Sequence, residues 1–269
     1  MKKHLGTCAL CRKRVDLTFE HIPPRAAFNS APAKPITGEK IIGDNDRMPW
    51  DMTGLQYSNQ QQGMGKFSLC AECNNNTGTW YANDYIKVAK VIHHIVWNGN
   101  MEDINGLGIR GVHPLRFIKQ VLSMFCSINN FDDSRINELR AFVLKKNAIG
   151  IDKSKYKIDM YITKSNLMKY APLSVMIKST HAGIESIALS EITAYPLGFV
   201  LYFNPSTTWK YDGIDITNFG NYRFDELMNI EIPLCIKEMN DILPIYYRSR
   251  EEIRRCIDCN KINFKDNQV

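Results

Sequence analysis

The chain has 269 residues, of which 44% are hydrophobic and 23% are charged, and its formal net charge is +6. These values are ordinary for a globular protein, and no apolar run is long enough to cross a membrane. The basic excess lies mostly in residues 1–100, which hold 12 Lys and Arg against 8 Asp and Glu. It is too small to indicate nucleic-acid binding by itself.

The start of the chain, Met1–Gly6, has positive charge but no apolar segment behind it, so no signal peptide is expected. We therefore expect a cytoplasmic protein. In that compartment the eight cysteines are expected to be metal ligands or buried thiols rather than disulfides.

The first predicted unit covers residues 1–100. It begins with a tight Cys-x-x-Cys turn at Cys8–Cys11, and apolar and polar residues then alternate over Val15–Ile22, which is typical of a strand. Residues 26–67 are rich in Pro, Gly, Asn and Gln. That composition predicts a long, irregular excursion between regular elements.

A second Cys-x-x-Cys turn follows at Cys70–Cys73. Apolar residues beyond it recur at helical spacing. Because Gly78 weakens the turns before it, we expect the helix to begin near Trp80, and Gly99 is a plausible end.

A glycine-rich stretch, residues 100–112, predicts a linker to a second unit over 113–269. This unit begins with a predicted helix over Leu115–Ile128 and a second helix from Ser134. Strand-like runs follow at 157–163, 174–178, 191–203 and 230–237. The expected fold class is α+β, with two separate domains.

The two Cys-x-x-Cys pairs predict a structural zinc site. A spacing of two residues lets both thiolates of a turn face one metal while backbone N–H groups support them. The predicted ligands are Cys8, Cys11, Cys70 and Cys73. Four thiolates leave no open position for water, so any chemistry requires a second site.

Residues beside the cysteines suggest where that second site lies. An acid-histidine dipeptide, Glu20-His21, is followed by Pro23, and Asn74 comes directly after the second cysteine pair. In this order, over roughly residues 5–98, the chain resembles the HNH, or ββα-metal, endonuclease family, and in particular its branch with a four-cysteine zinc site. The resemblance implies an N-terminal ββα-metal treble clef with bound zinc, followed here by the separate α+β domain.

The resemblance also implies the roles of three residues. His21 would be the general base that deprotonates the attacking water, and Glu20 and Asn74 would be ligands of a catalytic Mg²⁺ or Mn²⁺. Neutral imidazole titrates in the right range for a base, and hard cations prefer oxygen ligands. Because adjacent strand residues face opposite sides, Glu20 and His21 can share a site only if the hairpin is twisted or the ion lies at its edge.

The implied function is metal-dependent hydrolysis of DNA that leaves 3′-hydroxyl and 5′-phosphate ends, in phage defence or in a mobile element. The alternative is a zinc-dependent module that binds nucleic acid or protein without catalysis. The family commonly has an Asn a few residues before the second cysteine pair, which orients the loop of the base. Here Gly65 stands five residues before Cys70, and Asn59, Gln61 and Gln62 are the candidate substitutes.

Basic residues near the cysteines, namely Arg25, Lys66 and Arg12–Arg14, are candidates for phosphate contacts, with solvated surface charge as an equal alternative. His93, His94 and His113 are expected to pack on a helix or in the linker.

A third pair, Cys256 and Cys259, has no partner pair and is expected to be two free thiols, while Cys126 and Cys235 are expected to be buried. Residues 113–269 carry no motif with chemistry. They are expected either to recognise a partner protein or signal that restrains the nuclease, or to form a homodimer that lets two sites cut both strands.

Overall fold

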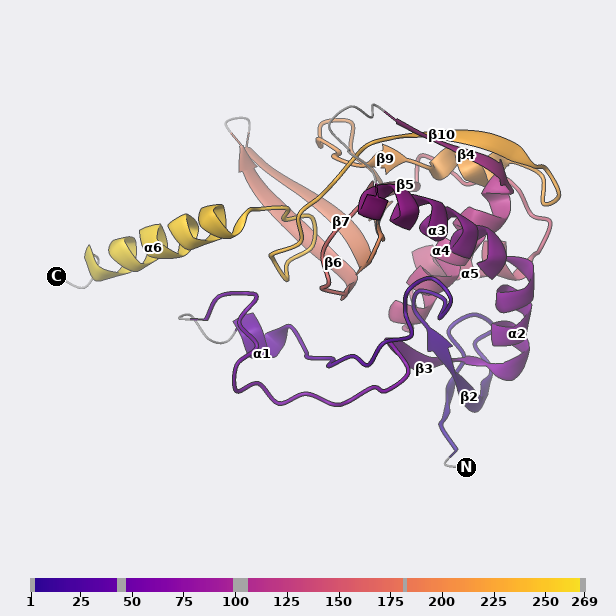
Figure 1. Ribbon diagram of the computed structural model, residues 1–269, viewed down its shortest axis with the longest axis horizontal. Coiled ribbons are helices and arrows are strands. Elements are labelled where there is room, and N and C mark those ends of the chain that lie inside the picture. Colours follow the sequence, from indigo (N-terminus) through magenta and orange to yellow (C-terminus); the bar gives the residue numbers. More distant parts are fainter. Residues whose placement is uncertain (1–2, 43–46, 99–105, 181–182, 267–269) are drawn as a thin grey trace.

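The computed structural model describes residues 3–42, 47–98, 106–180 and 183–266 (Figure 1). Helices and sheets are mixed along the chain, which confirms the predicted α+β class. In that part of the chain, no helix is both long and apolar enough to cross a membrane.

The N-terminal part is a small antiparallel sheet followed by two helices. Strands β1 (Leu5–Thr7), β2 (Arg14–His21) and β3 (Gly65–Cys70) pair in the order β1-β2-β3. Between β2 and β3 the chain makes a long excursion whose one helix among the described residues is the short α1 (Glu39–Ile42). The predicted strand and the predicted irregular excursion are both confirmed.

Helix α2 (Ala71–Trp80) begins directly after β3, so the expected helix start near Trp80 is wrong. The reason is the cap: Cys70 has extended backbone angles, and its thiol accepts a hydrogen bond from the backbone N–H of Cys73. This bond supports the first turn, and the helix continues through Gly78 to Trp80. Helix α3 (Ala82–Asn98) follows after a break at Tyr81.

The predicted linker is partly a strand. Residues 99–105 lie outside the described ranges, but β4 (Gly106–Val112) pairs antiparallel with β10 (Met228–Pro233). Its side chains Leu107, Ile109 and Val112 are buried. The glycine content of this segment predicted a linker, but the segment is a strand whose apolar side chains face the core.

Two helices follow as predicted. They are α4 (Pro114–Ile128) and α5 (Ser134–Leu144), the latter capped by the Asp133 carboxylate, which accepts a hydrogen bond from the backbone N–H of Arg135. Every residue of α4 except Arg116 is buried. Helix α4 is therefore the central helix of the molecule.

A five-stranded antiparallel sheet packs behind α4, with the order β6-β7-β8-β5-β9. Its strands are β5 (Tyr156–Ile162), β6 (Lys169–Thr180), β7 (Gly183–Ala194), β8 (Leu197–Phe203) and β9 (Ile214–Asp215). The predicted single run over 191–203 is thus divided between β7 and β8. A short 3-10 helix, η2 (Thr217–Asn221), precedes β10.

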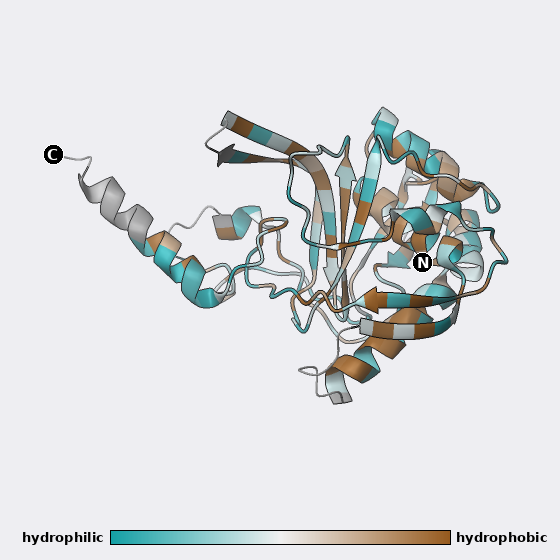
Figure 2. Cartoon of the chain, turned by 90° about the horizontal axis from the view of Figure 1, so that it is seen from above, coloured by the Kyte–Doolittle hydropathy of each residue, from teal (hydrophilic) through white to brown (hydrophobic). Residues whose placement is uncertain are grey.

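The last element, α6 (Arg250–Asp266), was not predicted and projects away from the body (Figure 1). Figure 2 shows that its described start is mostly hydrophilic, whereas the helices of the body carry long hydrophobic stretches.

The hydrophobic core does not divide at the boundary expected near residues 100–113. One cluster of buried side chains runs from Cys8 to Ile232. At its centre, the ring of Tyr85 on α3 stacks on Phe117 of α4 at 5.8 Å, and Phe117 lies 6.0 Å from Phe199 of β8. Helix α4 contacts α2, α3 and β3 of the N-terminal part as well as β6 and β7 of the large sheet.

Candidate active site

The four predicted cysteine ligands come together. The sulfur atoms of Cys8, Cys11, Cys70 and Cys73 all lie within 4.8 Å of one another. The first pair occupies the turn between β1 and β2, and the second spans the end of β3 and the first turn of α2. Four thiols in this arrangement can bind a metal such as zinc.

Backbone N–H groups donate to two of the four sulfurs. The backbone N–H of Cys70 donates to Cys8 Sγ at 3.3 Å, and that of Cys73 donates to Cys70 Sγ at 3.4 Å. A hydrogen bond from Cys73 lowers the pKa of Cys8 to about 4, whereas the same contact raises the pKa of Cys73. Like charges this close disfavour one another, so a fully ionised set requires a cation between the sulfurs.

Glu20 is a buried carboxylate at the end of β2, with 5% of its surface exposed. Its Oε2 accepts hydrogen bonds from two hydroxyls, that of Ser68 on β3 at 2.8 Å and that of Ser127 on α4. These bonds fix the carboxylate and leave Oε1 as its uncommitted oxygen. Burial raises the pKa of Glu20 from its ordinary value near 4.5 to about 7.

Replacing Glu20 with glutamine should stabilise the protein above pH 7 in buffer without Mg²⁺ or Mn²⁺. Between pH 4.5 and 7 the unfolded chain loses the proton of this carboxyl while the folded chain keeps it, so stability falls as the pH rises through this window. Glutamine has no such proton to lose, so the variant keeps the roughly 3 kcal/mol of unfolding free energy that the unmodified chain loses. Urea unfolding should show similar stabilities near pH 4.5 and a more stable variant at pH 8.

The matched control is Glu72→Gln, since Glu72 is an exposed carboxylate on α2. The difference in unfolding free energy between the Glu72→Gln variant and the unmodified chain should be the same at pH 4.5 and at pH 8. A Glu20→Gln variant that is less stable at pH 8 would contradict the burial argument.

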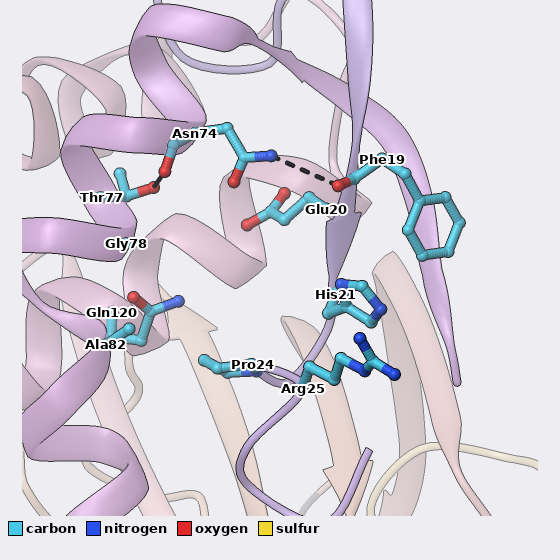
Figure 3. A pocket seen from close by; sticks show the side chains of 10 residues that line it. All are labelled: Phe19, Glu20, His21, Pro24, Arg25, Asn74, Thr77, Gly78, Ala82 and Gln120. Atoms are coloured by element: carbon cyan, nitrogen blue, oxygen red, sulfur yellow. Dashed lines mark hydrogen bonds between the residues drawn. The ribbon is translucent and has the colours of Figure 1, made fainter. Parts of the chain in front are cut away.

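Asn74 lies on the first turn of α2 and faces β2. Its amide nitrogen donates to Thr18 Oγ1 at 2.9 Å and to the carbonyl of Phe19 at 3.3 Å. Both contacts use N–H groups, so the side-chain oxygen remains available. Figure 3 shows the Asn74 side chain extending from α2 toward the Glu20 carboxylate. The two residues thus offer a pair of oxygen atoms of the kind that hard cations prefer.

His21 is the last residue of β2, and one hydrogen bond to the described residues holds its ring. Its Nε2 lies 2.9 Å from the carbonyl oxygen of Gln62. A carbonyl can only accept, so Nε2 carries the proton and Nδ1 keeps its lone pair. The ring also contacts Phe19 edge to face at 5.1 Å. This tautomer leaves an imidazole nitrogen that can accept a proton.

The three predicted residues line one cavity of about 190 Å³. Its walls are formed by Phe19, Glu20, His21, Pro24, Arg25, Asn74, Thr77, Gly78, Ala82 and Gln120 (Figure 3). A β-bulge between Thr18 and Phe19 shifts the register of β2 against β3. The shift comes before Glu20 and His21, which pair regularly with Lys66 and Gly65 and lie where β2 ends at the cavity. Among the basic candidates, Arg25 lines it.

Asn29 was missed by the sequence analysis. It is buried, and its amide nitrogen donates to the carbonyls of Pro23 and Met64, both at 2.7 Å, while its oxygen accepts from the Met64 N–H at 2.7 Å. It therefore ties the chain after His21 to the chain before β3. No side chain at Asn59, Gln61 or Gln62 has this role.

Gly63 makes this close approach possible. It has a φ of +93°, and a Cβ at this position would lie 2.1 Å from the Asn29 carbonyl oxygen. The sequence signal was absent because Asn29 and Met64 are 35 positions apart. Gln62, one of the expected substitutes, contributes through its backbone carbonyl instead of its amide.

The residues after 113 also reach this site. Ser127 binds Glu20, Gln120 lines the cavity, and the hydroxyl of Tyr170 on β6 donates to the carbonyl of Ile22. One sequence signal could have indicated this contribution of α4 to the site: two polar residues, Gln120 and Ser127, lie two turns apart in a helix that is otherwise largely apolar.

The remaining cysteines and histidines have other surroundings. Cys126 is buried in α4, the Cys235 thiol donates to the carbonyl of Asp212, and Cys256 is exposed on α6. The side chain of Cys259 is outside the described part of the chain. His93 pairs with the Tyr195 hydroxyl at 2.8 Å, and His113 pairs with Asp84 at 3.0 Å, contacts between neighbouring elements.

Comparisons with known proteins give no relative. No protein-family model, no curated protein and no solved structure matches this chain.

Proposed function

We propose that this chain is a metal-dependent endonuclease of the HNH type that hydrolyses phosphodiester bonds in DNA. One observation carries the proposal: Glu20, His21 and Asn74 line a single cavity. Each is held by hydrogen bonds that leave free the atom its role requires.

The proposed roles divide between two metal sites. Cys8, Cys11, Cys70 and Cys73 would hold zinc, which would fix the start of α2, and with it Asn74, against β2. Glu20 Oε1 and Asn74 Oδ1 fit a hard divalent cation such as Mg²⁺ or Mn²⁺, which keeps most of its waters and takes one or two protein oxygens. When bound there, the cation would stabilise charge on the phosphate and on the departing oxygen.

His21 is the base in the hydrolytic step. Its Nδ1 takes a proton from water as the water oxygen forms a bond to phosphorus. The bond from phosphorus to the 3′ oxygen breaks, and that oxygen takes a proton from solvent, which leaves a 3′-hydroxyl and a 5′-phosphate. The carbonyl of Gln62 stabilises the resulting imidazolium through the Nε2 hydrogen bond. Arg25, on the wall of the cavity, would contact the phosphate.

Cleavage should require a divalent cation and should slow when Asn74 is replaced. Supercoiled plasmid incubated with the zinc-loaded protein should be nicked when Mg²⁺ or Mn²⁺ is added and should remain intact without them. Asn74→Leu removes a ligand oxygen and should lower the nicking rate by about 10- to 100-fold, the usual cost of losing one such polar contact.

The control is Asn218→Leu, a change at an exposed position in η2 outside the cavity. If the unmodified protein nicks neither DNA nor RNA with any divalent metal, the endonuclease proposal fails. Retained binding of plasmid would then favour the non-catalytic zinc-dependent module.

A further inference from the structure

Gln120 on α4 is a buried polar side chain with 4% of its surface exposed. Among the described residues its Oε1 is buried without a hydrogen-bond partner, and no protein group accepts a hydrogen bond from its Nε2. An unpaired buried amide costs about 1–3 kcal/mol, and such a group in a folded protein calls for an explanation.

Gln120 lies where a ligand would meet it. It lines the cavity that Glu20, His21 and Asn74 share. In the view of Figure 3, the amide nitrogen is the end of the side chain turned toward Glu20 and Pro24. Two turns along the same helix, Ser127 holds the Glu20 carboxylate. One face of α4 therefore contributes two polar groups to the site.

The chemistry of the cavity suggests what the amide binds. The uncommitted oxygens of Glu20 and Asn74 suit a cation, whereas the Gln120 nitrogen supplies N–H donors. A phosphodiester has two non-bridging oxygens that accept hydrogen bonds. Arg25, on the same wall, would add positive charge for the same group. If the phosphate lies between the cation ligands and α4, its oxygens can contact the cation on one side and accept a hydrogen bond from the Gln120 N–H groups on the other.

We propose that Gln120 binds the scissile phosphate, with its Nε2–H donating to a non-bridging oxygen. This inference rests on the proposed endonuclease function. It places a substrate contact on an element that the sequence assigned to a different domain, because α4 belongs to residues 113–269. The second part of the chain would then complete the active site.

The test is Gln120→Met, which removes the amide and keeps a similar length and volume. The catalytic efficiency for plasmid nicking with Mn²⁺ should fall by about 10- to 100-fold, because a hydrogen bond to a charged group is lost. The affinity for Mn²⁺ should be unchanged, and the melting temperature should be equal or higher, because an unpaired polar group has left the core. A structural role would instead lower the melting temperature.

Two further variants sharpen the result. Gln60→Met is the matched control: the Oε1 of Gln60 also lacks a partner, but the residue is not part of the cavity wall, so nicking should not change. Gln120→Glu distinguishes a phosphate donor from a cation ligand. A carboxylate repels phosphate and should lower nicking further, whereas tighter Mn²⁺ binding with retained nicking would overturn the proposal.

Duplex binding in Ca²⁺, a condition chosen to prevent turnover, separates this inference from the function on which it rests. Gln120→Met should weaken binding of a short DNA duplex by at least several-fold, measured by fluorescence anisotropy. If the unmodified protein never cleaves, the endonuclease proposal fails. If Gln120→Met cleaves and binds as the unmodified protein does, the phosphate contact is wrong.

Discussion

Replacing His21 with alanine should lower the rate of DNA cleavage by about 10²- to 10⁴-fold, the usual contribution of a general base. The carbonyl of Gln62 fixes the protonated nitrogen at Nε2, so Nδ1 is the atom that accepts a proton from water. No other imidazole lines the cavity of the described structure. His21 is only half-buried, so the variant should fold and keep its zinc.

Chemical rescue gives this prediction a sharper readout. Imidazole added to the His21→Ala variant should restore part of the cleavage rate, because a small base can occupy the space that the ring leaves. His94→Ala is the matched control, since His94 is an exposed histidine on α3 away from the cavity. Equal cleavage by His21→Ala and the unmodified protein would show that the base is another group.

Replacing Cys70 with serine should remove the structural metal and unfold the N-terminal part. Bound zinc contributes about 10–16 kcal/mol to the folding of small zinc-dependent units, which is comparable to the whole stability of a typical protein. Cys70 also caps α2. The other three sulfurs of the cluster are themselves predicted ligands, so none of them can replace the Cys70 sulfur on the metal. Metal analysis should find about one zinc per chain, and none in the variant.

The matched control for that experiment is Cys235→Ser. The Cys235 thiol donates to the carbonyl of Asp212 at 3.2 Å, a bond that a serine hydroxyl can replace. Zinc content and melting temperature should therefore stay close to those of the unmodified protein. A folded, zinc-free Cys70→Ser protein with normal thermal stability would contradict the scaffold role of the metal.

Local patterns were enough to predict the cysteine cluster and most helices and strands. The spacing of Cys8 and Cys11 and the alternation over Val15–Ile22 each depend on residues close in sequence. The start of α2 was mispredicted because propensity favours a break at Gly78, whereas the Cys70 thiol caps the helix through the backbone N–H of Cys73. Residues 106–112 were mispredicted because glycine content suggested a linker, whereas pairing with β10 makes a strand.

The supporting residues of the site could not be predicted in the same way. Asn29 acts through the backbone of Met64, and Ser127 reaches Glu20 across 107 positions. Such contacts depend on how elements pack and leave no spacing rule in one sequence. The three residues expected to do the chemistry were found only through a family resemblance.

The shared core also limits how this chain can be rearranged. A gene fusion or recombination event that joined residues 1–100 to an unrelated sequence would separate Glu20 from the Ser127 hydroxyl and Ile22 from the Tyr170 hydroxyl. It would also uncover the face of α3 that packs on Phe117. We therefore expect that the cysteine-bearing segment does not fold as a transferable module, and that natural exchange of parts preserves residues 1–100 together with α4 and the large sheet.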